Sequence, residues 1–300
     1  MNGILSIKKL QDINKMDNIN LITEPWKDYE LIDSGDNKKL ERYGKYVICR
    51  PETQALWKPL KTDAWKKCDA EFEWKEGKGS WQKNNLPESW EMSWQNVSFI
   101  SQLTSFKHTG VFPEQAPNWA WLADKVSKLK EPKVLNLFGY TGIASVICAK
   151  NGAKVTHLDA SKQSNAWAKK NAELSGIEEG GIRYILDDGL KFSEREVRRG
   201  SVYDGIILDP PAFGRGPKGE VWKIEEQFPR LMETLEKLLS KKPSAFFLLN
   251  GYAAGYSPQS FLQAVESYFP KTKSESGELH IKESESLRCI PSGIYVRFAR

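Results

Sequence analysis

Apolar runs of strand length alternate with segments of helix length through the second half of the sequence. Helices are predicted at 143–151, 161–175, 221–239 and 258–268. Strands are predicted at 133–138, 154–158, 182–186, 202–208, 245–249, 278–282 and 294–299. Strands that alternate with helices at this spacing pair in parallel and are covered by helices. The fold class is therefore α/β, a doubly wound parallel sheet with its ligand site at the carboxyl ends of the strands.

The first third of the sequence has a different pattern. Short alternating runs are separated by Gly, Pro and Asn clusters, which predicts a small antiparallel β domain at 25–105, after a polar tail at 1–24. This part holds seven of the 11 tryptophans. They could form a stacking surface for unpaired bases, but we favour bulk for a thin β core that has few aliphatic residues.

Composition excludes several classes of protein. Hydrophobic residues make up 40% and charged residues 28%, which excludes a disordered chain, and no apolar run reaches the roughly 18 residues of a membrane helix. Because charges also interrupt the N-terminal apolar stretches, a cytoplasmic protein is expected. The cysteines are far apart, and with three histidines they predict free thiols and no metal site. The net charge of +5 falls on 106–300 and permits an anionic partner.

A glycine-bearing turn, 136–142, follows the first predicted strand and leads into a helix. Such a turn brings backbone amides close to a ligand. Asp159 ends the second strand, where a carboxylate can accept both hydroxyls of a ribose. It could instead be an N-cap, but Ser161 can fill that role. Of Asp187 and Asp188 after the third strand, we favour Asp188 as the acceptor of an adenine amine, with the other as a solvated cap.

The fourth predicted strand runs directly into Asp209-Pro210-Pro211-Ala212-Phe213. Two prolines end strand pairing and make the chain rigid at this edge of the sheet. The catalytic group is therefore predicted to be Asp209, Pro210, Pro211 and Phe213, with the Asp209 carboxylate as proton acceptor and Phe213 as a face for a planar group. A plain Pro-Pro loop is the alternative.

These segments resemble the motifs of class I S-adenosylmethionine-dependent methyltransferases. Residues 106–223 are similar to the RlmI/RlmK-like family of large-subunit rRNA methyltransferases, in which a segment like 109–115 contacts the cofactor. The resemblance implies a Rossmann-like methyltransferase domain at 106–300, S-adenosyl-L-methionine as cofactor and an RNA substrate. The expected cofactor-binding residues are Thr109, Phe112, Glu114, Asn136, Phe138, Gly139, Gly142, Asp159, Ala160, Asp188 and Asp209.

The sequence departs from this family in three places. Pro113-Glu114 stands where the family tends to have an apolar and an acidic residue, and residues 25–105 differ from the family's PUA module. No cysteine follows the fifth strand, at 249–255, whereas members that methylate cytosine C5 have a nucleophilic one there. Because a nitrogen lone pair needs no such thiolate, we expect nitrogen methylation. A chain starting near residue 104 is expected to keep cofactor binding if it folds.

Other functions remain open at this point. The cations Lys191, Arg195, Arg198, Arg199, Arg215 and Lys218 either hold phosphates near the site or form a solvated helix face. A methyltransferase of a protein amide or small molecule fits the mild charge, and a cofactor-binding scaffold without turnover is a third hypothesis. A nicotinamide dehydrogenase is disfavoured by the glycine spacing.

Overall fold

A central sheet of eight strands organises the computed structural model, which describes residues 19–75, 78–84, 86–252 and 255–300. The strand order is β1-β16-β17-β15-β12-β9-β10-β11. The strands are β1 (Leu21–Thr23), β9 (Lys133–Leu137), β10 (Lys154–Asp159), β11 (Ile182–Leu186), β12 (Gly205–Leu208), β15 (Phe246–Gly251), β16 (Glu275–Lys282) and β17 (Cys289–Ala299). Strands β9, β10, β11, β12 and β15 are parallel neighbours, which confirms the predicted α/β fold.

One strand departs from the expected all-parallel order, and one further strand was not expected. Strand β17 is antiparallel to β15 and to β16, because β16 and β17 form a hairpin. Strand β1 pairs with β16, so the N-terminal 1–24 segment, predicted as a tail, contributes a strand to the main sheet.

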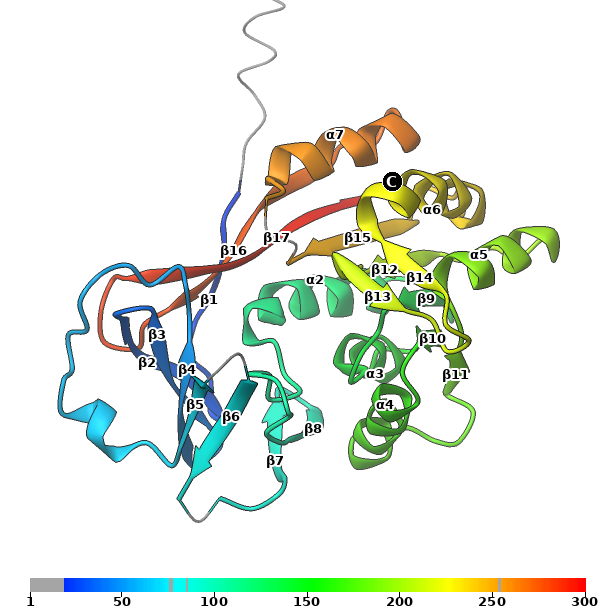
Figure 1. Ribbon diagram of the computed structural model, residues 1–300. Coiled ribbons are helices and arrows are strands. Elements are labelled where there is room, and N and C mark those ends of the chain that lie inside the picture. The colour runs from blue at the N-terminus through cyan, green and yellow to red at the C-terminus, as the bar shows by residue number, and fades with distance from the viewer. Residues whose placement is uncertain (1–18, 76–77, 85, 253–254) are drawn as a thin grey trace, which may run out of the picture.

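Helices cover both faces of this sheet, with α2, α3 and α4 on one side and α5, α6 and α7 on the other (Figure 1). They are α2 (Ala116–Ser127), α3 (Ile143–Lys150), α4 (Lys162–Leu174), α5 (Gly189–Arg198), α6 (Ile224–Leu238) and α7 (Pro258–Tyr268). The helix expected at 221–239 begins three residues late, because 221–223 pair with 213–215 as a small hairpin, β13 (Phe213–Arg215) and β14 (Val221–Lys223).

The N-terminal part forms two smaller sheets. The first contains β2 (Tyr29–Gly35), β3 (Lys38–Tyr43), β4 (Tyr46–Pro51), β5 (Ala70–Lys75) and β6 (Lys78–Lys83), and the second contains β7 (Trp90–Trp94) and β8 (Val97–Ser101). The pairing is antiparallel as expected except between β4 and β5, which are parallel. The β7–β8 hairpin lies against the helices, where Asn171 of α4 accepts a hydrogen bond from the Ile100 backbone.

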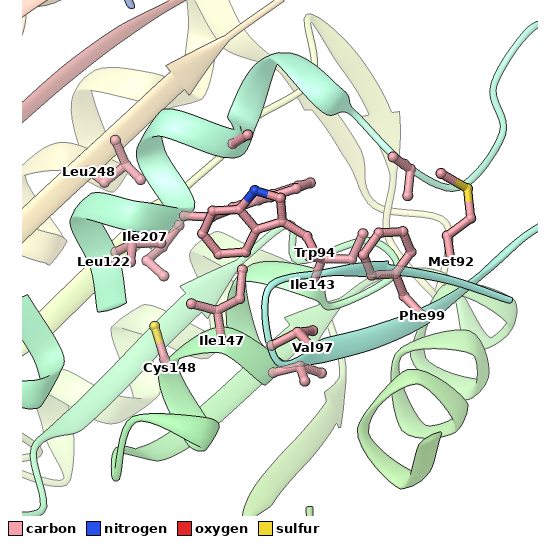
Figure 2. Close-up of a cluster of buried hydrophobic side chains, with 14 of the residues drawn as sticks. Met92, Trp94, Val97, Phe99, Leu122, Ile143, Ile147, Cys148, Ile207 and Leu248 are labelled. Carbon is pink, nitrogen blue, oxygen red and sulfur yellow. The ribbon is translucent and has the colours of Figure 1, made fainter. Parts of the chain in front are cut away.

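One apolar core joins the N-terminal part to the main sheet. Figure 2 shows Trp94 and Phe99 of the β7–β8 hairpin packed with Leu122 of α2 and Ile143 of α3. The same cluster includes Tyr29 of β2. Trp94 is 8% exposed, and Trp26, Trp57, Trp81 and Trp90 pack against this core, which confirms the interpretation of most tryptophans as core residues. No helix in the described residues is long and apolar enough to span a membrane.

Candidate functional site

A cavity of about 910 Å³ lies at the carboxyl edge of the main sheet. The residues that follow β9, β10, β11, β12 and β15 all contribute to its wall. This is where a parallel α/β sheet presents side chains and free backbone groups to a ligand. Of the residues expected from the sequence, it collects Phe112, Glu114, Phe138, Asp159, Ala160, Asp188, Asp209, Pro210 and Pro211.

The turn after β9 carries backbone strain. Phe138 and Tyr140 have φ angles of 57° and 48°, in the left-handed region that non-glycine residues rarely occupy, and both line the cavity. Gly142 has φ 77°, and a Cβ there would lie 2.6 Å from the Cβ of Ala168. A Cβ on Gly139 would meet the His157 ring at 2.4 Å. The two glycines are therefore required by packing beneath the turn, while the aromatic residues face the site.

Asp159, at the end of β10, holds this turn in place. Its two carboxylate oxygens accept hydrogen bonds from the backbone N–H groups of Tyr140, at 2.9 Å, and Ser161, at 2.8 Å. Because a carboxylate offers about four acceptor positions, further hydroxyl donors can still bind. Burial raises the pKa of Asp159 despite these two hydrogen bonds. Ser161 is the N-cap of α4, as expected, since its side chain accepts from the Ser164 N–H.

Of the acidic pair after β11, Asp188 and not Asp187 is the helix cap, which differs from the expectation. Asp188 is the N-cap of α5, with one oxygen accepting from the Lys191 N–H at 2.9 Å. Asp187 accepts from the Asp188 N–H with one oxygen and from the Arg195 guanidinium with the other. The residue expected to bind a ligand is thus also the cap, and the cap uses only one of its two carboxylate oxygens.

Asp209 follows β12 directly, and the two prolines after it end the strand as expected. The Pro211 carbonyl accepts a hydrogen bond from the Trp222 indole N–H at 2.7 Å, which anchors the turn. Burial and the nearby negative charge of Glu114 raise the pKa of Asp209 to about 7. A carboxylate with this pKa is suited to accept a proton near neutral pH.

The structure places Phe213, the expected face for a planar group, on a small hairpin beside the cavity. It lies in β13, where it pairs with Lys223 of β14. It is 55% exposed and is not among the residues that line the cavity. The pairing of β13 with β14 has no clear signal in the sequence pattern. Phe112 and Tyr252, with ring centroids 5.2 Å apart, are among the aromatic residues that line the cavity.

Thr109, Asn136, Gly139 and Gly142 also lie outside the residues that line the large cavity. Thr109 is fully buried, and its carbonyl accepts from the Ser101 hydroxyl. The Asn136 side chain donates to the Ser145 hydroxyl at 2.8 Å. Asn136 and Gly139 line a smaller cavity of about 70 Å³ beneath the turn. Their direct contacts are therefore structural.

The N-terminal sheet supplies one wall of the cavity, which sequence reasoning missed. Lys39 of β3 and Arg50 of β4 line it together with Lys107 and His108. The Arg50 guanidinium lies 2.7 Å from the Glu41 carboxylate, and both are buried. Burial, with the charge of Arg50, lowers the pKa of His108 to about 4, so this imidazole is neutral at pH 7. Only tertiary packing brings these residues to the site.

Half of the cations that could hold phosphates are paired within the protein. Arg195 binds Asp187, Arg199 lies 2.8 Å from Glu196, and Lys191 lies 2.9 Å from Glu220. These contacts favour the helix-face interpretation for α5, whereas Arg215 of β13 lines the cavity. Cysteine is absent from the lining of the cavity in the described residues, and no group of three potential metal ligands occurs among them.

Comparison with known proteins identifies relatives of both the sequence and the fold. The sequence model of a family described as S-adenosylmethionine-dependent methyltransferase matches residues 65–274. The crystal structure of an S-adenosylmethionine-dependent methyltransferase from Agrobacterium tumefaciens is 41% identical with a TM-score of 0.90, covering 94% of this chain and 93% of that one. The structure of SMU.776, a putative methyltransferase complexed with S-adenosylhomocysteine, shares the fold at 18% identity and a TM-score of 0.72, covering 98% of this chain and 78% of that one.

Curated relatives match a shorter segment. Ribosomal RNA large subunit methyltransferase K/L from Shewanella frigidimarina is 34% identical over 156 residues, which is 51% of this chain and 21% of that protein. The protein of the same name from Pseudoalteromonas translucida is 30% identical over 156 residues, with the same coverage of each chain. The chain therefore spans about a fifth of the length of these relatives.

Proposed function

Since the chain belongs to the S-adenosylmethionine-dependent methyltransferase family, we propose that it methylates a nitrogen atom of an RNA base, with Asp209 as the proton acceptor. The observation that carries this proposal is the position of Asp209, on a rigid Pro-Pro turn at the sheet edge with its pKa raised to about 7. A cytoplasmic location, where ribosomal RNA is found, is part of the proposal.

The residues of the cavity fit S-adenosylmethionine as the methyl donor. Asp159 keeps acceptor positions for the ribose hydroxyls, and Asp188 offers one carboxylate oxygen to the adenine amine. Phe138 and Tyr140 also line this cavity. When bound, the cofactor supplies a methyl group on a positively charged sulfur, which becomes a neutral thioether on transfer.

The protein aligns the acceptor nitrogen and removes its proton. Phe112 and Tyr252 present ring faces to a planar base, and the Asp209 carboxylate accepts a hydrogen bond from the nitrogen to be methylated. As the nitrogen lone pair forms its bond to the methyl carbon, the nitrogen becomes acidic and its proton moves to Asp209. Positioning and proton transfer thus supply the catalysis, and no covalent intermediate with the enzyme is needed.

RNA is favoured as the substrate by the names of the curated relatives and by the net charge of +5. Within this proposal the N-terminal part, residues 25–105, contributes to substrate capture, and the presence of Lys39 and Arg50 in the cavity wall supports this role. Loss of binding to RNA at raised salt would fit phosphate contacts.

Mass spectrometry of nucleosides in total RNA from cells with and without this gene tests the proposal. We expect one N-methylated nucleoside to disappear with the gene and to be restored by the wild-type protein. Cys289→Ser should also restore it, because Cys289 lies outside the cavity lining. A missing 5-methylcytosine, or no change in RNA, would contradict the proposal. Methylation of a protein amide or a small molecule would then replace it.

A further inference from the structure

Trp74 of β5 is the exposed exception among the 11 tryptophans, all of which lie in the described residues. Trp74 is 58% exposed, and its ring contacts the buried Phe72 ring, with centroids 5.4 Å apart. Phe72 also contacts Trp81 of β6, with centroids 5.1 Å apart. In the β5–β6 ladder Trp74 lies opposite Gly79, which has no side chain to cover it. An open aromatic ring thus stands on a buried aromatic support.

The strand register places Trp74 on the same face of the N-terminal sheet as Arg50. Ile48 of β4 pairs in parallel with Ala70 of β5. Arg50 follows Ile48 by two residues, and Trp74 follows Ala70 by four. Because side chains alternate along a strand and paired residues point to the same side, all four side chains share one face. Arg50 lines the cavity, so Trp74 lies on the sheet face that forms the cavity wall.

The segment 104–107 connects this aromatic cluster to the cavity. The Trp81 indole N–H donates to the Phe106 carbonyl at 3.2 Å, and Phe106 is itself 64% exposed. The next residue, Lys107, lines the cavity, and its carbonyl accepts a hydrogen bond from Arg50 at 3.1 Å. Two exposed aromatic residues, Trp74 and Phe106, are therefore held beside a segment that leads out of the cavity.

The charges on β5 and β6 are separated by face. Lys83 is exposed and lies opposite Ala70, which places it on the Trp74 face. Glu71 and Glu73 alternate with the aromatic residues of β5, so both carboxylates of these two strands lie on the other face. An aromatic face that carries a cation fits a partner with planar groups and phosphates, as single-stranded nucleic acid has.

We propose that Trp74 and Phe106 form a stacking site for unpaired RNA nucleotides that flank the base bound in the cavity. This inference rests on the proposed RNA substrate and adds its conformation, single-stranded next to the target base. Aromatic side chains stack on every base, because every base has a π face. Bases within a duplex already stack on their neighbours, so this site selects unpaired ones. Lys83, on the same face, is available to a phosphate.

The test measures binding of the full-length protein to a fluorescently labelled single-stranded RNA of mixed sequence, by anisotropy with S-adenosylhomocysteine present. Trp74→Ala should weaken binding about tenfold, the size typical of losing one stacked base. Trp74→Phe should stay close to wild type, because it keeps an aromatic face. Trp74→Leu keeps apolar volume without a ring and should bind as weakly as Trp74→Ala. Phe106→Ala should also weaken binding.

Leu287→Ala is the matched control, because Leu287 is 93% exposed on the turn between β16 and β17, and it should bind as wild type does. The same RNA annealed to its complement should bind wild type and Trp74→Ala equally. Equal binding of the single strand by wild type and Trp74→Ala, or full binding by Trp74→Leu, would overturn the inference.

Failure of this inference and failure of the proposed function give different results. A nucleoside that disappears with the gene, while Trp74→Ala binds RNA as tightly as wild type, would remove the stacking site alone. Binding of single-stranded RNA that depends on Trp74, without any change in nucleosides, would support the stacking site and contradict only the proposed methylation.

Discussion

Arg288, on the turn between β16 and β17, places a guanidinium nitrogen 2.6 Å from the Asp33 carboxylate of β2. The same guanidinium lies 2.9 Å from Glu283, and the Asp33 side chain is 1% exposed. Asp33 also accepts from the Trp65 indole N–H. This ion pair ties the C-terminal hairpin to the N-terminal sheet that forms one wall of the cavity.

Arg288→Ala should lower the free energy of unfolding by about 2 to 4 kcal/mol, because it leaves two buried carboxylates without their cation. Chemical denaturation of the full chain measures this. Lys66→Ala is the control: Lys66 and Asp63 form an exposed pair, and its loss should cost less than about 1 kcal/mol. Equal effects of the two substitutions would show that the buried pair contributes no more than an exposed one.

Asp209→Asn should reduce kcat by about 100-fold or more, the size typical of losing a positioned proton acceptor. In the wild-type enzyme the acceptor must be ionised, so the rate should rise with pH through about 7 and level off above it. Rate measurements across pH with RNA from cells lacking the gene test both points. A rate that is independent of pH between about 5.5 and 8.5 would count against Asp209 as the base.

The stability of the folded protein should also depend on the ionisation of Asp209, but this contribution should fall as pH rises. The folded-state pKa of Asp209, about 7, lies above the ordinary aspartate value, so between these pH values the folded chain holds a proton that the unfolded chain releases. This contribution to stability is therefore complete at low pH and is lost as pH rises toward 7. The Tm of Asp209→Asn relative to wild type should accordingly increase from about pH 5 to about pH 8. A constant difference would argue against the raised pKa.

Asp159→Ala should weaken binding of S-adenosylhomocysteine at least tenfold, since charge-assisted hydrogen bonds contribute roughly 1.5 to 3 kcal/mol each. Calorimetry measures this directly. Lys162→Ala, at an exposed position near the same strand end, serves as a control and should keep wild-type affinity. Unchanged binding in Asp159→Ala would remove this residue from the proposed cofactor site.

A shortened chain that begins at residue 104 should fail to fold cooperatively. Without the N-terminal sheets, three residues of α2 would be exposed: Trp119, Leu122 and Val126. In the full chain they share a buried core with Tyr29 and Trp94. Differential scanning calorimetry should show no sharp transition, so the condition set by the sequence-based expectation, that the shortened chain folds and then binds cofactor, should not be met. A cooperative transition together with binding of S-adenosylhomocysteine would restore that expectation.

The sequence predicted those parts of the site that depend on one strand and the turn after it. Asp159 and Asp209 were found because each directly follows an apolar run, and strand ends of a parallel sheet converge. The contribution of Arg50 was not predictable, because it depends on how a separate sheet packs across the cavity. The contact of Tyr252 with Gln115 was not predictable either, because it crosses 137 residues of sequence. The position of Phe213 on a hairpin was not predictable, because the β13–β14 pairing has no strong local signal.

The pairing of β1 with β16 has a consequence for how the protein is made. Leu21 lies opposite Leu279, so β1 has no partner in the main sheet until residues up to Leu279 have left the ribosome. At ordinary translation rates, the residues between these two take roughly 10 to 50 seconds to synthesise. Hairpins such as β2–β3 can form early, but β1 must wait with its backbone groups unpaired. Slowing translation of the residues between β1 and β16 should therefore extend the period in which nascent chains can aggregate.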